Sequence, residues 1–267
     1  MSFSPLQLVI GMAVMFSALV LTRNLQADEQ YEARKFRAKD EIELNYRWLQ
    51  PKGYVPGEKS DTKYPLVIFL HGAGERGDDN AAQLRHCTSR FSEADVREKF
   101  PCFVMAPQCP TGKRWVEVDW SKGQHDMPET PSEPMARVLE LLDQLIKTHA
   151  IDVDRIYVMG LSMGGYGTWD LLARHPERFA AGVPICGGGD EKQAAKIKDI
   201  PIWVFHGDAD TAVKVERSRN MVDAIKEAGG KPKYTEYPGV GHNSWTPAIN
   251  EPEILPWLFS KKRDAAK

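Results

Sequence analysis

A glycine-rich turn between a strand pattern and a helix pattern constrains this chain more than any other feature. The turn is Gly160-Leu-Ser-Met-Gly164. Apolar, strand-favouring residues at 155–159 precede it. Residues 165–175 follow it with helical spacing and end before Pro176. A side chain on either glycine would clash in so sharp a turn. The sequence therefore predicts a strand, a strained turn with Ser162 at its apex, and a helix.

This arrangement favours a chemical role for Ser162. The helix N-terminus would place backbone N–H groups and the positive end of the helix dipole beside the hydroxyl oxygen, where negative charge develops in acyl transfer. The five-residue pattern alone also occurs in tight glycine turns that have no chemistry. Because a strand precedes it and a helix follows it, we predict that Ser162 is a nucleophile.

A nucleophilic serine needs a base, and an acid to orient that base. In this turn architecture the order along the chain is serine, acid, histidine. Residues 201–205 form another predicted buried strand, and Asp208 and Asp210 follow it on a loop. A last strand, at 233–237, leads into the glycine-rich loop that carries His242. We predict Asp210 as the acid and His242 as the base. Asp208 is the alternative acid, or a turn-forming residue.

The other histidines have simpler interpretations. His149 and His175 lie at predicted helix ends, where histidine interacts with terminal carbonyl groups. His86 and His125 lie in polar stretches and are expected to be solvated. His206 ends a buried strand and is expected to brace the acidic loop.

The second half of an oxyanion hole is expected at an early strand end. Residues 65–70 form the clearest apolar strand, and His71-Gly-Ala-Gly74 follows it. Small residues there let the backbone approach a substrate carbonyl. We predict that the N–H groups of Met163 and Ala73 bind the oxyanion, with Gly72 as the alternative to Ala73. A phosphate-binding interpretation fails because the required glycine spacing and lysine are missing.

Several segments together resemble one group of enzymes, and they span most of the chain from about residue 40 onward. They are Leu70-His-Gly-Ala-Gly-Glu-Arg-Gly77, Ala106-Pro-Gln-Cys-Pro110, Gly160-Leu-Ser-Met-Gly-Gly165, Pro184-Ile-Cys-Gly-Gly-Gly-Asp190, His206-Gly-Asp-Ala-Asp210 and Tyr237-Pro-Gly-Val-Gly-His-Asn-Ser-Trp245. The chain resembles α/β-hydrolases of the dienelactone-hydrolase and prolyl-oligopeptidase-like group. Within it, the chain is similar to small bacterial predicted peptidases or carboxylesterases, near feruloyl esterases and polyhydroxybutyrate depolymerases.

The resemblance carries site roles onto matching positions of this chain. It implies Ser162 as nucleophile, Asp210 as acid, His242 as base and Ala73 in the oxyanion loop. One departure is Lys214, which stands where relatives often have proline. Since Lys214 lies past the acid, it affects these assignments little.

The order of the predicted elements defines the fold class. Strand-like and helix-like segments alternate from Pro65 onward, including a helix at 215–228. This predicts an α/β-hydrolase fold with a mostly parallel central sheet and helices on both faces. Residues 41–49 alternate like an antiparallel edge strand. The segment 176–200 is too short to hold a large cap domain.

Composition limits the partners. The 267 residues carry a formal net charge of −2, which gives no electrostatic basis for binding nucleic acid. No Cys/His cluster has zinc spacing, so we expect no metal and no cofactor. The four cysteines suggest no particular disulfide pairing.

Residues 6–21 form the one strongly apolar stretch of the chain. A helix of that length spans roughly 24 Å, less than the ~30 Å hydrocarbon core of a membrane. Its length suits a signal peptide with cleavage after Ala27, whereas a retained anchor and a buried helix are the alternatives. We predict residues 1–27 as a signal peptide or membrane anchor and residues 28–267 as the catalytic domain. The protein would then be periplasmic or secreted, or else anchored at its N-terminus.

Substrate contacts are harder to predict. Residues 108–131 form a long loop that carries Trp115. With Trp245 beside the base, this loop is expected either to form a pocket wall or simply to pack against the domain. Glu75 is a further candidate contact, unless it pairs with Arg76.

The leading prediction is a serine esterase acting on small-molecule esters, including carbohydrate-linked or aromatic-acid esters. A serine peptidase using the same residues is the alternative. A catalytically silent, envelope-tethered binding protein is a third. The lack of an inserted domain favours accessible esters over internal peptide bonds.

Overall fold

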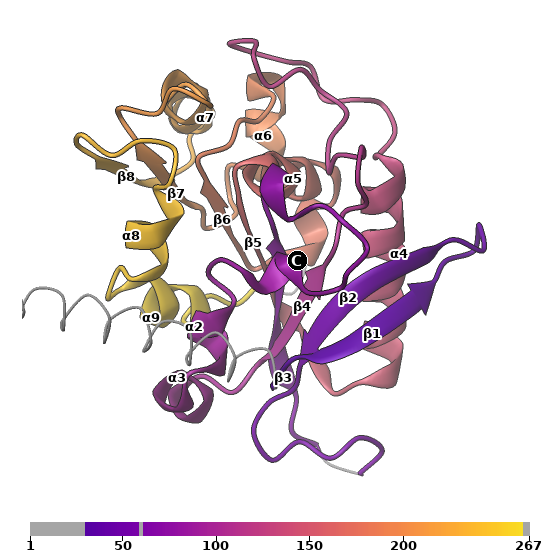
Figure 1. The fold of residues 1–267 in the computed structure, drawn as a ribbon. Coiled ribbons are helices and arrows are strands. Elements are labelled where there is room, and N and C mark those ends of the chain that lie inside the picture. Colours follow the sequence, from indigo (N-terminus) through magenta and orange to yellow (C-terminus); the bar gives the residue numbers. More distant parts are fainter. Residues whose placement is uncertain (1–29, 59–60, 264–267) are drawn as a thin grey trace, which may run out of the picture.

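An eight-stranded sheet forms the centre of the computed structural model, which describes residues 30–58 and 61–263 (Figure 1). The sheet order is β1-β2-β4-β3-β5-β6-β7-β8. The strands are β1 (Glu32–Arg37), β2 (Glu43–Leu49), β3 (Tyr64–Leu70), β4 (Phe103–Pro107), β5 (Ile151–Leu161), β6 (Ala181–Ile185), β7 (Trp203–Gly207) and β8 (Lys233–Tyr237). Neighbours from β4 through β8 pair in parallel, so the predicted mostly parallel sheet is confirmed.

The strand predicted at 41–49 is antiparallel, as expected, but it does not lie at the edge of the sheet. It corresponds to β2, which pairs antiparallel with both β1 and β4. The edge is therefore β1, whose burial pattern is mostly exposed. A mostly exposed strand gives a weaker sequence signal than a half-buried one, because it lacks the regular alternation of apolar and polar residues.

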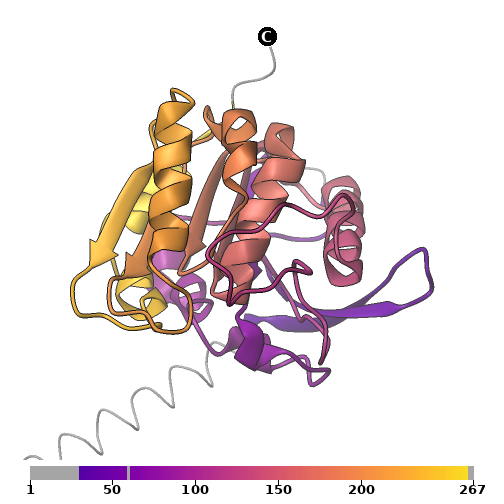
Figure 2. The ribbon, with the colours of Figure 1, turned by 90° about the horizontal axis from the view of Figure 1, so that it is seen from above.

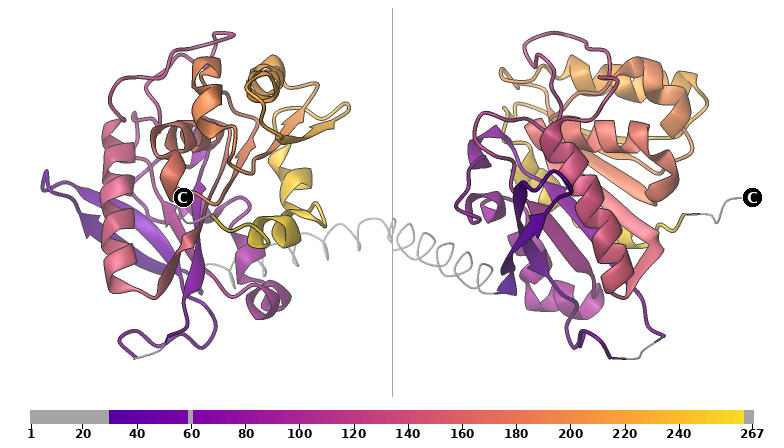
Figure 3. Two further views of the ribbon diagram at one scale, coloured as in Figure 1. Left: turned by 180° about the vertical axis from the view of Figure 1, so that it is seen from behind. Right: turned by 90° about the vertical axis from the view of Figure 1, so that its right-hand side faces the viewer.

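Helices cover both faces of the sheet (Figures 2 and 3). One face carries α4 (Glu133–Thr148), α5 (Met163–Arg174), α6 (Ala194–Ile197) and α7 (Glu216–Glu227), and the other carries α2 (Ser89–Ser92), α3 (Ala94–Lys99), α8 (Trp245–Ile249) and α9 (Ile254–Phe259). Short 3₁₀ turns are η1 (Ala73–Glu75), η2 (Ala82–Leu84), η3 (Pro176–Arg178) and η4 (Glu191–Gln193).

The alternation along β3 explains this two-sided core. Leu66, Ile68 and Leu70 face the cluster packed by α4, α5 and α7, whereas Val67 and Phe69 face the cluster packed by α8 and α9. Successive side chains of a strand point to opposite faces, so a continuous apolar run indicates a strand buried on both sides.

The connections place the loops that matter for function. Between β6 and β7 the chain forms only η4 and α6, so the expected absence of a large cap domain holds for this fully described segment. Residues 108–131 form neither helix nor strand, as predicted. Because β3 to β8 run in parallel, their carboxyl ends meet along one edge of the sheet, where ligands bind in such folds.

The predicted signal peptide or anchor, at 1–27, lies outside the described residues. Among residues 30–58 and 61–263, no helix combines the length and apolar character needed to cross a membrane. The four cysteines, Cys87, Cys102, Cys109 and Cys186, are buried and free.

Candidate active site

The predicted sharp turn connects β5 directly to α5. Ser162 adopts φ 52° and ψ −117°, in a region that side-chain-bearing residues rarely occupy. Such a conformation costs roughly 1–3 kcal/mol and persists only where its surroundings enforce it. A Cβ on Gly160 would lie 2.2 Å from the Gly164 carbonyl oxygen, and one on Gly164 would lie 1.9 Å from the Leu70 carbonyl oxygen. Both glycines are therefore required for the close packing of β5, α5 and β3.

Ser162, His242 and Asp210 form one continuous hydrogen-bonded series. The Ser162 Oγ lies 2.8 Å from the His242 Nε2, and the His242 Nδ1 lies 2.7 Å from the Asp210 Oδ2. A carboxylate only accepts hydrogen bonds, so Nδ1 carries the imidazole proton and Nε2 is left to accept from the hydroxyl. The three side chains come from three separate loops at the carboxyl edge of the sheet. The structure therefore brings together the three residues that the sequence order predicted.

Asp210 is held by four donors. Its Oδ1 accepts from the N–H groups of Ala212 (2.8 Å) and Val213 (3.0 Å), and its Oδ2 accepts from His242 and from the Nε2 of His206 (3.1 Å). Burial by itself raises the pKa of this carboxyl. The hydrogen bonds from His206, His242 and Val213 outweigh that effect and hold the pKa well below its usual range. The carboxylate is therefore ionised and able to orient the imidazole.

His206 braces the acidic loop, as predicted, and touches the acid itself. It is fully buried, and its Nε2 faces both the Asp210 carboxylate and the carbonyl oxygen of Val213 (2.9 Å). Two acceptors fix the proton on Nε2, so Nδ1 accepts from the Ser218 hydroxyl at 2.7 Å. Asp208, the alternative acid, instead accepts from the Gly239 N–H at 2.6 Å and is exposed. It therefore acts as a turn-forming residue beside the loop that carries His242.

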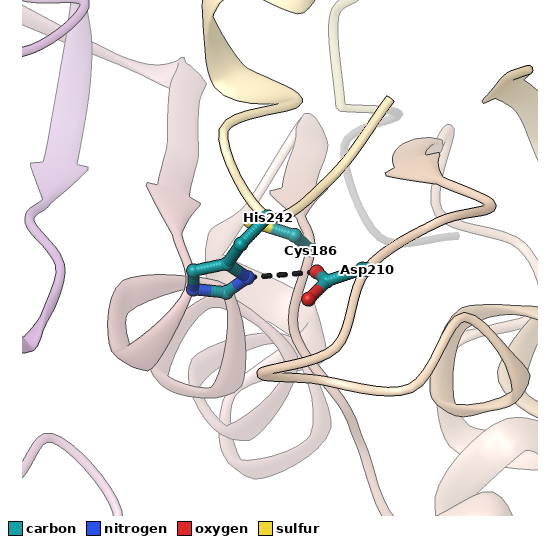
Figure 4. A group of neighbouring side chains, drawn as sticks. All are labelled: Cys186, Asp210 and His242. Carbon is teal, nitrogen blue, oxygen red and sulfur yellow. Dashed lines mark hydrogen bonds and ion pairs between the residues drawn. The ribbon is translucent and has the colours of Figure 1, made fainter. Parts of the chain in front are cut away.

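Cys186, Asp210 and His242 place one sulfur, oxygen and nitrogen ligand atom within 4.8 Å of one another (Figure 4). A metal would need a thiolate and a free imidazole nitrogen here. Burial raises the pKa of the Cys186 thiol to about 12, so it stays protonated. The His242 Nδ1 is already bonded to Asp210. These side chains fit a hydrogen-bonded site better than a metal centre.

The predicted oxyanion donors lie at two adjacent turns. Met163 is the first residue of α5 and Ala73 the first residue of η1, so neither N–H has an acceptor within its own helix. Gly72 precedes η1, and a Cβ there would lie 3.6 Å from the Ser162 Cβ, so this turn is close to Ser162. The arrangement suits a carbonyl oxygen placed between the two turns. The binding role of both amides remains a prediction.

Hydrogen bonds of His71 and Trp115 stabilise the turn that carries Ala73. The His71 Nε2 accepts from the Cys109 N–H at 2.9 Å, and its Nδ1 donates to the Gly72 carbonyl at 2.6 Å. Burial lowers the pKa of His71 to about 4, so it is neutral. The Trp115 Nε1 donates to the His71 carbonyl at 3.0 Å. Since Trp115 is 0% exposed, the expectation that it forms a pocket wall is wrong, and it packs the loop down instead.

Trp245 and Glu75 are the other two predicted substrate contacts. The Trp245 ring is perpendicular to the His242 ring, at 5.4 Å between centroids, and is partly exposed. Glu75 is buried, and its Oε1 lies 3.6 Å from the His86 Nε2. Arg76 donates to the Ala73 carbonyl instead of pairing with Glu75. Substrate contact by Trp245 and Glu75 remains a prediction.

His125 differs from its sequence interpretation. It is half-buried and bonded to the guanidinium of Arg217, a residue of α7 that the sequence did not single out. Two sequence features lie in this neighbourhood, although neither indicates a contact with His125. One is the glycine run 187–189 after β6, and the other is an arginine in the first turn of the helix after the acid.

The fold and the site together define an α/β-hydrolase. The chain belongs to the phospholipase/carboxylesterase family, whose sequence profile matches residues 56–251. The predicted class, a serine hydrolase acting on esters, is confirmed at this level.

Three similar proteins illustrate the family. A crystal structure of a thermostable esterase superposes with a TM-score of 0.81 at 42% identity, covering 89% of this chain and 64% of that one. The carboxylesterase SOBER1 of Arabidopsis thaliana is 27% identical over 197 residues, covering 67% of this chain and 83% of its own. The poly(3-hydroxyalkanoate) depolymerase C of Paucimonas lemoignei is 30% identical over 131 residues, covering 46% of this chain and 28% of its own.

Proposed function

We propose that this protein is a serine esterase in which Ser162 is the nucleophile, His242 the general base and Asp210 the orienting acid. The single observation that carries the proposal is the unbroken hydrogen-bonded series from the Ser162 hydroxyl to the Asp210 carboxylate. In such a series the imidazole has the tautomer that accepts the hydroxyl proton, and the carboxylate stabilises the imidazolium that forms.

The first half of the reaction forms an acyl-enzyme. The Ser162 Oγ attacks the ester carbonyl carbon while its proton moves to the His242 Nε2. The carbonyl oxygen becomes an oxyanion that accepts hydrogen bonds from the N–H groups of Met163 and Ala73, at the positive end of α5. The carbon–oxygen bond to the alcohol then breaks, and Nε2 returns the proton to the departing alkoxide.

The second half releases the acid. A water molecule gives a proton to the His242 Nε2 and attacks the acyl carbonyl carbon. The same two amides bind the second oxyanion. The bond to the Ser162 Oγ breaks as Nε2 returns the proton to that oxygen, which restores the starting state.

We propose small-molecule esters as substrates, including carbohydrate-linked or aromatic-acid esters. The segment between β6 and β7 builds no cap over the site, so a substrate does not have to enter an enclosed chamber. The names of the similar proteins, a carboxylesterase, a thermostable esterase and a polyester depolymerase, agree with ester chemistry.

Export is a separate proposal that rests on the apolar stretch at residues 6–21. N-terminal sequencing of the protein recovered from the host's periplasm or medium tests it. A mature N-terminus near residue 28 supports a cleaved signal peptide, whereas recovery of the intact chain with membranes supports the anchor.

Turnover of a panel of esters tests the activity. Short acyl p-nitrophenyl esters and feruloyl esters should be hydrolysed with saturable kinetics, and Ser162→Ala should abolish the reaction. If wild-type protein shows only the background hydrolysis of buffer, the esterase proposal fails.

A further inference from the structure

Arg217 is a buried cation without a carboxylate partner in the described part of the chain. It is 1% exposed, and its Nη2 donates to the His125 Nδ1 and to the Gly189 carbonyl oxygen at 3.1 Å. Its Nε and Nη1 have no acceptor among residues 30–58 and 61–263. A guanidinium removed from water is unfavourable unless acceptors replace its hydration. The structure therefore leaves two strong donors unsatisfied.

The side chains around Arg217 add further donors. Its guanidinium lies over the Tyr166 ring, 5.7 Å from the centroid, and its positive charge acts on the buried Tyr166 hydroxyl. The Trp120 ring lies 6.4 Å from the Tyr166 ring, and Trp169 packs against Gly189. The ring N–H groups of both tryptophans are buried and have no acceptor among the described residues. We call Arg217, Tyr166, Trp120 and Trp169 the donor cluster. Only the Tyr166 hydroxyl can accept a hydrogen bond within this cluster, because an indole N–H and a guanidinium only donate, so donors remain in excess.

The carboxylates on neighbouring elements are already engaged. Asp190 accepts from the N–H groups of Met127 (2.9 Å) and Lys192 (3.0 Å) and from the Gln193 side chain (2.9 Å). Asp170 is bonded to Arg174 at 2.8 Å. The excess of donors over acceptors favours a ligand that brings acceptor oxygens.

The donor cluster lies beside the proposed catalytic residues. Tyr166 is one helical turn after Ser162, and its N–H donates to the Ser162 carbonyl at 3.1 Å. A Cβ on Gly188 would lie 2.4 Å from the Arg217 Nε, so the missing side chain there is what admits the guanidinium. Ser218, the next residue along α7, bonds to the same His206 that holds Asp210. A group of the substrate that reaches Arg217 would therefore remain close to the nucleophile.

His125 is bonded to Nη2 of Arg217, the guanidinium nitrogen that matters most for recognition of a carboxylate. Nη2 belongs to both two-pronged edges of a guanidinium, one formed with Nε and the other with Nη1. Nη2 donates one hydrogen to His125 and the other to the Gly189 carbonyl, so neither edge is free while His125 is in place. Burial, together with the Arg217 charge, lowers the pKa of His125 to about 4, so it is a neutral acceptor. A carboxylate is a stronger acceptor and has two oxygens that match such an edge.

The segment that carries His125 is fixed after the ring and exposed before it. Arg174 donates to the carbonyl groups at residues 128–130, whereas residues 121–124 are exposed. Met127 donates to Asp190, and Lys192 pairs with Asp126 at 2.7 Å on the exposed surface. A surface ion pair of this kind contributes little. A small cavity also borders His125, lined in part by Met127 and Gly189. That cavity is too small for an imidazole ring, but His125 is partly exposed, so the ring can move only outward, toward solvent.

We propose that Arg217 anchors a subsite for a carboxylate carried by the substrate, and that His125 fills this subsite when no substrate is bound. The inference rests on the proposed esterase function and narrows the substrate class. It assigns esters that bear a free carboxylate in the acid or alcohol part, such as half-esters of dicarboxylic acids.

Binding to the Ser162→Ala protein tests the proposal without turnover. Half-esters of dicarboxylic acids of increasing chain length are titrated by calorimetry against the neutral diesters of the same acids. At least one half-ester should bind about thirtyfold more tightly than its diester, as expected for a charge-assisted two-pronged pair. In Ser162→Ala/Arg217→Met this preference should vanish, and in Ser162→Ala/Arg217→Lys it should fall by about tenfold.

Two further variants serve as controls. Arg219→Met removes a partly exposed arginine from the same helix and should leave the preference unchanged. His125→Ala removes the cover and should tighten half-ester binding several-fold. If half-esters and diesters bind alike in the protein with Arg217, or if the preference survives Arg217→Met, the proposal is overturned.

The binding measurement separates this inference from the proposed function. Suppose that binding depends on the carboxylate but the protein carrying Ser162 turns over no ester. The esterase proposal would then be wrong, whereas the subsite would be supported. Turnover of neutral esters with no preference for half-esters would support the esterase proposal and overturn the subsite.

Discussion

Two polar clusters lie at the carboxyl edge of the same sheet and differ in how their polar atoms are satisfied. In the first, the Asp210 carboxylate accepts from four donors and the His242 ring is bonded at both nitrogens. In the second, Arg217 retains two nitrogens without an acceptor among the described residues. Ser218 connects the two clusters through His206 and the backbone of α7.

The difference separates chemistry from recognition. Groups that must be in place at the moment of reaction gain from being fixed beforehand, because they then need no reorganisation in the transition state. A group that recognises a substrate must instead leave donors for the ligand to satisfy. On this account the first cluster performs the reaction, whereas the second helps to choose the substrate.

The largest expected effect comes from removing the nucleophile. Ser162→Ala should lower kcat on the order of 10⁶-fold, by analogy with triads that act as a unit. Half-ester binding through Arg217 should survive the same change, because the two clusters serve different steps. Steady-state kinetics and calorimetry on one preparation check both statements. Activity within tenfold of wild type would remove Ser162 from the mechanism.

A smaller effect should distinguish the two acids. Asp210→Asn should lower kcat on the order of 10⁴-fold, because an amide no longer fixes the imidazole tautomer. Asp208→Asn is the matched control, since Asp208 contacts the Gly239 N–H and does not contact His242. It should cost less than about tenfold. A reversed order of these two effects would show that the acid is misassigned.

Bond type should produce a difference on the order of 10². An amine must be protonated as it leaves and needs a tightly placed scissile bond, whereas an alkoxide departs more easily. The described chain has no inserted domain to build extended peptide subsites. We expect kcat/KM for short-chain or aromatic-acid esters to exceed that for matched peptide amides by at least about a hundredfold, or about 2.7 kcal/mol. Preference for amides in a side-by-side panel would favour the peptidase and leave the triad assignment intact.

The last expected effect leaves activity aside and concerns the dependence of stability on pH. The folded-state pKa of His71 is about 4, below the ordinary value of 6.5, because burial disfavours the charged ring. The contribution of the neutral ring to the free energy of unfolding is therefore complete above pH 6.5. It declines as the pH falls toward 4, by about 3 kcal/mol in total. Denaturant unfolding of wild type and His71→Gln across this range should show a shallower decline in the variant. Parallel curves would mean that His71 is not held neutral.

The first cluster was predictable from sequence because local rules determine it. Gly160 and Gly164 mark a turn that admits no side chain, and the strand and helix around it have clear apolar periods. The order of Asp210 and His242 then follows from parallel strands that end at one edge. The sequence also indicates His206 as a brace, although it cannot show that the ring touches the carboxylate.

The second cluster was not predictable, since long-range packing creates it. His125 lies in a polar stretch of a long loop, which is typical of a solvated side chain, and only the folded loop places it on Arg217. The sequence left the role of Trp115 open for the same reason, because its hydrogen bond to the His71 carbonyl joins residues far apart in sequence. The edge strand β1 was missed because it is mostly exposed and has a weak apolar period.

Covalent labelling tests the central claim most directly. The folded wild-type protein is incubated with a fluorophosphonate probe, its residual esterase activity is followed, and the adduct is located by peptide mass spectrometry. The account predicts one adduct, on Ser162, formed in proportion to the activity lost, and none on Ser162→Ala protein. An adduct on another residue, or an active enzyme that the probe does not label, would contradict it.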